Sequence, residues 1–296
     1  MSNIRKKQEI NDDKQKVAIV TGSSSGIGYA TVLRLARSGY FTFATMRNPA
    51  KGTDLIKIAE RENLPLLVEQ MDVANIESIK KFMERMRQST GRIDVLVNNA
   101  GYVLAGALED ISAEEIRKQF DTNLLGVIQV TQMALPFMRA QRSGIIINMG
   151  SLMGRLALPG ASAYVATKFA MEGMFESLAY EVAPFGIRVV IVEPGPVKTR
   201  ASDNTVVGQG ALEEDSPYLS MLGSVNAALR AWYETGITAD QVAETVIQAI
   251  SSPQPKLRYP VGIASAWLEK KNSMTDEQFQ EYIQNSITNL APSQSR

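Results

Sequence analysis

Short apolar, β-branched runs alternate with longer amphipathic stretches along the chain from Lys16 onward. Such short runs are typical of strands buried on both faces, and their alternation with helices is typical of a parallel sheet. The pattern predicts an α/β fold with one doubly wound, seven-stranded parallel sheet and helices on both faces. The predicted strands are Val17–Val20, Thr42–Thr45, Leu66–Gln70, Asp94–Val97, Ile145–Met149, Val189–Val192 and Arg258–Val261.

Four longer stretches have apolar residues at helical spacing. The alternation then fails between residues 200 and 235, where a polar, glycine-containing stretch is followed by Leu, Met and Trp. An insertion at this point of an α/β fold usually serves as a lid. We therefore predict a flexible polar N-terminal tail over residues 1–15, a single domain over 16–267 with a substrate lid at 200–235, and a helical C-terminal extension over 268–296. The predicted helices are Gly28–Arg37, Ile76–Gln88, Ala113–Arg139 and Ala163–Ala183.

Composition excludes several classes of protein. The chain has 296 residues and 45% hydrophobic content, and its 31 basic residues balance 31 acidic ones, so no charge excess favours a nucleic acid as partner. Cysteine and histidine are both missing, which excludes Ser-His-Asp hydrolases and metal centres held by these residues. Proton transfer then falls to Tyr, Lys, Asp or Glu. We expect a soluble, cytoplasmic protein with no metal and no membrane span.

The first predicted strand runs through a glycine-rich loop, Thr21–Gly28, directly into a helix. A TGxxxGxG loop in this context is typical of a dinucleotide site, where free amides at the helix N-terminus hold the pyrophosphate. The same loop also spells GxSxG, a hydrolase motif, but a serine without a histidine base is a poor nucleophile. We therefore assign the loop to phosphate binding, with the contacts Gly22, Ser24, Ser25, Gly26, Ile27 and Gly28.

The end of the second predicted strand bears on the choice of cofactor. Sites for NAD place an acidic residue there to hold the ribose 2′-hydroxyl, whereas an arginine pairs with the 2′-phosphate of NADP. In this chain the stretch ends in Arg47 and has no carboxylate. The sequence therefore favours NADP(H), with NAD(H) as the second choice.

Tyr164 and Lys168 lie four residues apart in a predicted helix, so their side chains share one face. A free tyrosine titrates at about pH 10, and a nearby cation favours its phenolate, which brings the phenol closer to working pH. The pair is therefore a candidate acid/base unit.

Further motifs accompany this pair: the run Asn98–Gly101 after the fourth strand, Ser151 after the fifth, and Asn123 midway along the long helix. With them, residues 16–199 resemble the classical short-chain dehydrogenase/reductase family, and the likeness continues more weakly to about Trp267. The resemblance implies a single-domain Rossmann fold and hydride transfer between a nicotinamide cofactor and a hydroxyl or carbonyl carbon.

The resemblance also implies a role for each motif residue. Tyr164 exchanges a proton with the substrate oxygen, Ser151 donates a hydrogen bond to it, and Lys168 holds the nicotinamide ribose and lowers the pKa of the tyrosine. Asn123 distorts its helix and anchors a water that links Lys168 to solvent. The remaining cofactor contacts implied are Asp72, Val73, Asn99, Ala100, Gly101, Pro194, Gly195, Val197 and Thr199, together with Tyr164 and Lys168.

Within the family, the run Tyr164–Ala183 and the stretch Ala44–Asn48 look most like the hydroxysteroid and retinol dehydrogenase branch. This implies an apolar alcohol, ketone or aldehyde as substrate, with steroid-, retinoid- and other lipid-like molecules all open. The family also implies a homodimer or homotetramer. Two alternatives remain: a catalytically silent NADP(H)-binding sensor or scaffold on the same fold, and an epimerase or dehydratase that keeps its cofactor bound.

Overall fold

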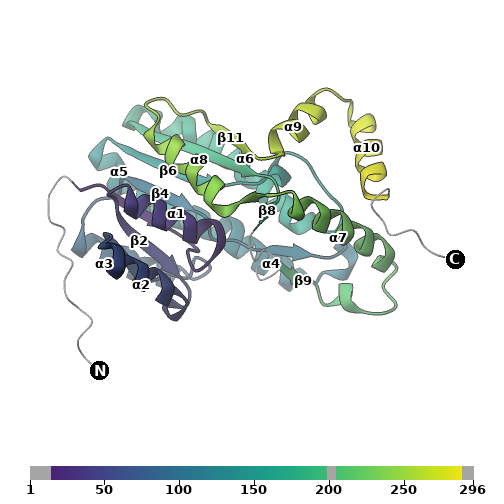
Figure 1. Ribbon diagram of the computed structural model, residues 1–296, viewed down its shortest axis with the longest axis horizontal. Helices are drawn as coiled ribbons and strands as arrows, with labels where there is room; N and C mark the ends of the chain where they lie inside the picture. Colours follow the sequence, from purple (N-terminus) through teal and green to yellow (C-terminus); the bar gives the residue numbers. More distant parts are fainter. Residues whose placement is uncertain (1–14, 199–204, 289–296) are drawn as a thin grey trace.

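A seven-stranded sheet lies at the centre of the computed structural model, which describes residues 15–198 and 205–288 (Figure 1). Every neighbouring pair of its strands is parallel, in the order β11-β7-β6-β4-β1-β2-β3. The order reverses on either side of β1 and β4, so the carboxyl ends of these two strands flank the crevice where doubly wound folds bind ligands. The strands are β1 Val17–Val20, β2 Phe41–Met46, β3 Leu66–Gln70, β4 Val95–Asn98, β6 Gly144–Met149, β7 Ile187–Pro194 and β11 Arg258–Val261.

Helices cover both faces of this sheet because alternate strand residues point to opposite sides. Ala18 and Val20 belong to one apolar core, and Val17 and Ile19 belong to the other. All four are inaccessible to solvent. The first core is closed by α1 Gly26–Arg37, α2 Thr53–Glu62 and α8 Ala239–Ser251, and the second by α3 Ile76–Ser89, α5 Gly126–Gln141 and α6 Ser162–Val182.

The predicted α/β sheet is confirmed, since each of the seven expected strands has its counterpart. The long helix expected over 113–139 is interrupted: α4 Ala113–Phe120 and α5 are joined by η3 Asp121–Leu125, a π-helical turn. The strand pattern did not reveal α2 or α8, whose sequences are short and carry charged residues on their exposed faces.

Two small parallel sheets lie outside the main one. Strand β8 Val197–Lys198 pairs with β10 Ile237–Thr238, and β5 Val103–Ala105 pairs with β9 Thr205–Val207. Helix α7 Leu219–Glu234 lies between β9 and β10 in the chain. The two pairings therefore fasten both sides of the predicted lid segment to the domain.

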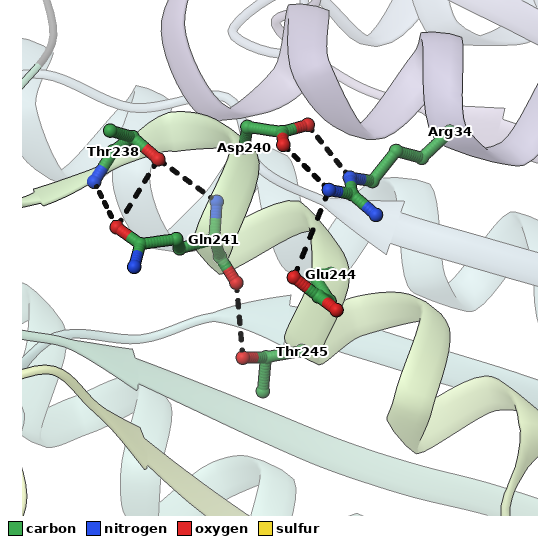
Figure 2. A network of polar contacts seen from close by, with 6 residues as sticks. All are labelled: Arg34, Thr238, Asp240, Gln241, Glu244 and Thr245. Atoms are coloured by element: carbon green, nitrogen blue, oxygen red, sulfur yellow. Dashed lines mark hydrogen bonds and ion pairs between the residues drawn. The ribbon is translucent and has the colours of Figure 1, made fainter.

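Helix α8 is joined to α1 by an ion pair that Figure 2 shows. Both nitrogens on one edge of the Arg34 guanidinium bond the Asp240 carboxylate, at 2.7 and 2.5 Å. The N-terminus of α8 is closed by a capping box in which Thr238 and Gln241 satisfy each other's backbone amides. The helix that follows the lid segment is thus joined to the helix that follows the glycine-rich loop.

The last two helices of the described residues are α9 Ala264–Asn272 and α10 Asp276–Thr288, and they pack against the lid (Figure 1). Trp267 lies edge-on to Trp232 of α7, with ring centroids 4.9 Å apart, and 5.9 Å from the ring of Tyr282. Across both described ranges, every helix is too short or too polar to cross a bilayer. The predicted tail, residues 1–15, lies outside the described residues apart from Gln15.

Candidate active site

The glycine-rich loop is tied to the end of β4 by the residues that follow that strand. The Thr21 hydroxyl accepts hydrogen bonds from the amides of Asn99 and Ala100, both at 2.9 Å. The Asn99 side-chain amide donates to the carbonyls of Thr21 and Gly22 at 2.9 and 3.0 Å. These bonds fix the loop beside the first turn of α1, whose amides have no partner within the helix.

Glycine is required at three positions of this loop, for two different reasons. Gly22 has a φ of +64°, a left-handed conformation that other residues adopt rarely, and Gly26 has a φ of +59°. At Gly28 the reason is space: a Cβ there would lie 2.4 Å from Asn99 Nδ2 and 2.6 Å from the Gly22 carbonyl oxygen. The loop and α1 therefore approach as closely as a phosphate cradle requires, which fits a dinucleotide.

The adenosine end of the expected site lies along β2 and β3. Arg47 directly follows β2, is exposed, and forms no hydrogen bond or ion pair through its guanidinium with any described residue. Asp72 follows β3, is half-buried, and accepts a bond from the Ala74 amide at 3.1 Å. Val73 beside it is buried. The structure brings a free cation and a carboxylate to the same edge of the sheet as the glycine-rich loop.

Asn123 lies in the π-helical turn, at the place where we expected it to distort the helix. Its side chain is fully buried, accepts a bond from the Tyr102 amide at 3.1 Å and donates one to the Tyr102 carbonyl at 2.9 Å. A Cβ on Gly101 would lie 3.2 Å from its Oδ1. Asn123 therefore holds the loop after β4 against the π turn. A π turn also frees a backbone carbonyl from the regular helical pattern.

Ser151 and Tyr164 meet above the carboxyl end of β6. Ser151 begins the short turn η4 Leu152–Gly154, and its hydroxyl accepts a bond from the Met153 amide at 3.1 Å. Burial raises the pKa of Tyr164 to about 12, while its hydrogen bond with Ser151 lowers that pKa and the phenol of Tyr233 raises it. The net direction differs from our expectation that Lys168 lowers this pKa, because desolvation of the phenolate dominates.

Lys168 lies on the same face of α6 as Tyr164, with its Nζ 5.7 Å from the centroid of the tyrosine ring. The residue is only 7% exposed. Its ammonium donates a hydrogen bond of 2.6 Å to the carbonyl of Met149, the last residue of β6. Burial lowers the pKa of Lys168 to about 8, and the carboxylate of Glu172 acts in the opposite direction. The ammonium is thus held beside the tyrosine in a poorly solvated place.

An ionic cluster with two buried carboxylates, Glu172 and Glu193, begins one helical turn after Lys168, and the sequence motifs did not predict it. Arg258 Nε donates to Glu172 at 2.9 Å and lies 3.7 Å from Glu193, while Arg155 Nη1 donates to Glu193 at 3.1 Å. The pairing joins α6, β7, β11 and the residue after η4. Two sequence signals could have indicated part of it: the spacing of four between Lys168 and Glu172, and the charged Glu193 within an apolar strand.

The segment after β7 is the one in which we expected the contacts to the nicotinamide. Pro194 is the last residue of β7, the Gly195 amide donates to the Val261 carbonyl at 3.1 Å, and Val197 is buried in β8. Thr199, the remaining residue expected in this segment, lies outside the described residues. Tyr233 of α7 is a further residue that the sequence did not single out, and its influence on Tyr164 places the end of the lid helix near the tyrosine.

Comparison with known proteins agrees with this arrangement. A family model described as short chain dehydrogenase matches residues 16–209. The chain belongs to the short-chain dehydrogenase family. Retinol dehydrogenase 8 of Bos taurus is 35% identical over 255 residues, covering 83% of this chain and 81% of that protein. The 3-ketodihydrosphingosine reductase of Bacteroides thetaiotaomicron is 31% identical over 268 residues, covering 90% and 96%.

Solved structures of short-chain dehydrogenases share the fold. A short-chain dehydrogenase from Streptomyces avermitilis has a TM-score of 0.81 at 31% identity, covering 94% of this chain and 99% of that chain. A metagenomic short-chain oxidoreductase in complex with NADP has a TM-score of 0.67 at 25% identity, covering 84% and 98%.

These matches establish the class of this short-chain dehydrogenase. NAD(P)-dependent hydride transfer is the general reaction of the family, so the chain is an oxidoreductase that acts on a CH–OH group or the corresponding carbonyl. The likeness to retinol dehydrogenase 8 confirms the predicted retinol dehydrogenase-like branch.

Proposed function

We propose that this short-chain dehydrogenase uses NADP(H) to interconvert a hydroxyl and a carbonyl on an apolar substrate, with Tyr164 as the acid/base residue. The observation that carries the proposal is the meeting of Ser151, Tyr164 and Lys168 at the carboxyl ends of the strands. A phenol, a hydroxyl and an ammonium within one small region are the groups that a carbonyl oxygen needs for protonation and charge stabilisation.

In the direction of reduction, the carbonyl oxygen of the substrate would accept hydrogen bonds from Ser151 and Tyr164. When bound, the reduced nicotinamide supplies the hydride that reaches the carbonyl carbon. The Tyr164 proton moves to the oxygen, so that an alcohol and a tyrosinate result. The ammonium of Lys168 stabilises that tyrosinate and is the group that would face the ribose hydroxyls. Oxidation of an alcohol follows the same steps in reverse.

The preference for NADP(H) rests on the edge of the sheet at β2. Arg47 is exposed and has no ion pair with any residue in the described ranges, so its guanidinium is available to a phosphate. The two residues before it, Thr45 and Met46, are buried and carry no charge. A ribose 2′-hydroxyl would therefore find no carboxylate from β2, which supports NADP(H) over NAD(H).

An apolar substrate is supported by the surroundings of Ser151. The residues after it contribute to an apolar cluster, and the lid helix faces them with more apolar side chains, among them Met221 and Trp232. An open hollow of about 460 Å³ lies between the lid and the start of α6, and its lining does not include Ser151, Tyr164 or Lys168. It is lined by Ala107, Leu108, Glu109, Pro159, Gly160, Ser162, Tyr218 and Met221.

The test is turnover by wild type and Tyr164→Phe on a panel that holds a retinoid aldehyde, a keto-sphingoid base, a steroid ketone and a small polar ketone. We expect NADPH oxidation with apolar members of the panel and a loss of at least about 100-fold in Tyr164→Phe, the size of a general-acid contribution. Tyr180→Phe is the matched control, because Tyr180 lies on the same helix but is 72% exposed. Turnover that survives in Tyr164→Phe would contradict the mechanism.

A silent NADP(H)-binding sensor on the same fold would behave differently in this assay. It would bind NADPH, as followed by cofactor fluorescence, yet turn over no member of the panel. A tightly held cofactor that does not exchange would instead favour an epimerase or dehydratase.

A further inference from the structure

Behind Lys168 lie two buried carboxyl groups that the proposed reaction does not use. Glu193 is fully buried and Glu172 is 5% exposed. One oxygen of each, Glu172 Oε1 and Glu193 Oε2, has no hydrogen-bond partner among the described residues. A carboxylate oxygen that is desolvated without a partner costs folding free energy. The pair is therefore difficult to explain as a device for stability alone.

The position of Glu172 connects it with the groups at the site. It lies one helical turn after Lys168 on α6, so the two side chains share a face. Its Oε1 lies beneath the turn that carries Ser151: a Cβ on Gly150 would be 3.2 Å from this oxygen, and a Cβ on Gly154 would be 3.3 Å from it. The carboxylate is thus enclosed between the lysine and the serine turn.

We infer that Glu172 is a positioning residue for Lys168, whose buried carboxylate keeps the neighbouring ammonium charged, and that Glu193 and Arg258 set how much charge Glu172 holds. The inference rests on the proposed function only in taking Lys168 as the cation that serves Tyr164 and the cofactor ribose. Lys168 itself bonds only a neutral carbonyl, that of Met149, so its charge has no directly bonded counter-ion among the described residues.

The charged groups around Glu172 come from every element packed against it. Lys168 lies on α6 itself, Glu193 on β7, Arg258 on β11, and Arg155 just after η4. Arg258 also bonds Glu176, at 2.6 Å, on the next turn of α6. Two arginines thus face three carboxylates, and Glu172 is the one that lies one helical turn from Lys168.

The directions of the pKa shifts agree with this geometry. Burial raises the pKa of Glu172 to about 7, the bond from Arg258 lowers it, and Glu193 raises it. Burial lowers the pKa of Lys168 to about 8, and Glu172 raises it. Glu172 therefore gains its charge as pH rises through about 7, and Lys168 loses its charge as pH rises through about 8.

The test is a titration of Lys168 in the full chain without cofactor or substrate, followed by NMR of ¹³Cε-labelled lysine. The Lys168 resonance is assigned by its loss in Lys168→Arg. We expect Glu172→Gln to lower the pKa of Lys168 by about one unit, the size expected when a charge a few ångströms away in a poorly solvated site is removed. Glu172→Asp, which keeps the charge, restores most of the shift.

Glu176→Gln is the matched control. Glu176 lies on the same helix and bonds the same arginine, but its side chain is 41% exposed and it lies two turns from Lys168. We expect this variant to leave the pKa of Lys168 unchanged. An equal shift in Glu172→Gln and Glu176→Gln would overturn the inference, and so would an unshifted Lys168 in folded Glu172→Gln.

Glu193→Gln keeps the test decisive if Glu172→Gln does not fold. When Glu172 ionises near pH 7, it shifts the Lys168 resonance slightly, which gives a small inflection in the titration curve of Lys168. Removing the like charge of Glu193 lowers the pKa of Glu172, so this inflection moves to lower pH. A resonance without that inflection in the wild type would overturn the inference. Because no turnover is measured, these results stand apart from the Tyr164→Phe assay, whose failure would overturn the proposed function and not the link between Glu172 and Lys168.

Discussion

Replacing Gly28 with alanine tests the close contact between the glycine-rich loop and α1. A methyl group at this position would lie 2.4 Å from the Asn99 amide nitrogen and 2.6 Å from the Gly22 carbonyl oxygen. Both distances are shorter than any contact of a real Cβ, and both partners are fixed. Asn99 bonds the carbonyls of Thr21 and Gly22, and Gly22 holds a left-handed turn. The loop must therefore move.

The expected magnitude follows from three contributions. Alanine gains about 1 kcal/mol over glycine inside a helix. Overpacking against fixed neighbours costs about 1–3 kcal/mol, and the loss of one of the two Asn99 bonds costs about 1 kcal/mol. The sum is a destabilisation of Gly28→Ala by about 1–3 kcal/mol, which contradicts the direction that helix propensity alone predicts.

Gly173→Ala is the matched control, since Gly173 also lies within a helix, α6, but a Cβ there would meet no atom within 4 Å. We expect this variant to be more stable than the wild type by up to about 1 kcal/mol. The assay is urea unfolding of the three proteins, with NADPH affinity measured by cofactor fluorescence. A Gly28→Ala protein that is as stable as Gly173→Ala and binds NADPH normally would refute the assignment of this contact.

Three further predictions concern the cofactor, the lid and pH. Arg47→Ala should weaken NADPH binding by about 1.5–3 kcal/mol, the worth of a bond to a charged group, and leave NADH binding unchanged, whereas Lys51→Ala should change neither. Thr238→Ala, which removes the cap of α8, should lower the free energy of unfolding by about 1 kcal/mol in urea titrations. Glu172 has a pKa of about 7 in the folded chain, above its ordinary 4.5. Between these two pH values, the folded state therefore holds a proton that the unfolded state has lost. The free energy of unfolding should therefore fall as pH rises through this window. In urea titrations at a series of pH values, Glu172→Gln should show a weaker dependence of this free energy on pH.

Most of the fold could be predicted because the strands are short, apolar and buried on both faces. Val17–Val20 is buried at every position, and so is Gly144–Met149. The ends of the strands were predicted less well. For example, β7 begins at Ile187, two residues before the predicted start, and continues to Pro194. Helix α2 was missed because its ten residues include a charged majority on the exposed side and follow a short 3-10 turn.

The candidate site was predictable wherever a motif lies within one loop or one helix. Tyr164 and Lys168 lie on one face of a single helix, and Gly22 to Gly28 lie in one loop and the start of the helix after it. Their spacing in the sequence is therefore enough to predict that they lie close together. The π turn at Asn123 could be expected only from the family resemblance, since the sequence around it reads as a continuous helix. Local spacing therefore accounts for the loop and the tyrosine–lysine pair.

The residues that sequence reasoning missed belong to contacts between distant segments. Glu193 is the penultimate residue of β7 and reads as part of an apolar strand, yet register places it beside Pro260 of β11, near enough for Arg258 to reach it. A charged residue inside a buried strand is itself a signal, because burial of an unpaired carboxylate is costly. It indicates that a cation must come from elsewhere, but only the sheet order β6-β7-β11 shows that the cation is Arg258 and that the resulting pair lies behind Lys168. The same topology that places Tyr164 at the carboxyl edge of the sheet thus sets the charges buried near Lys168.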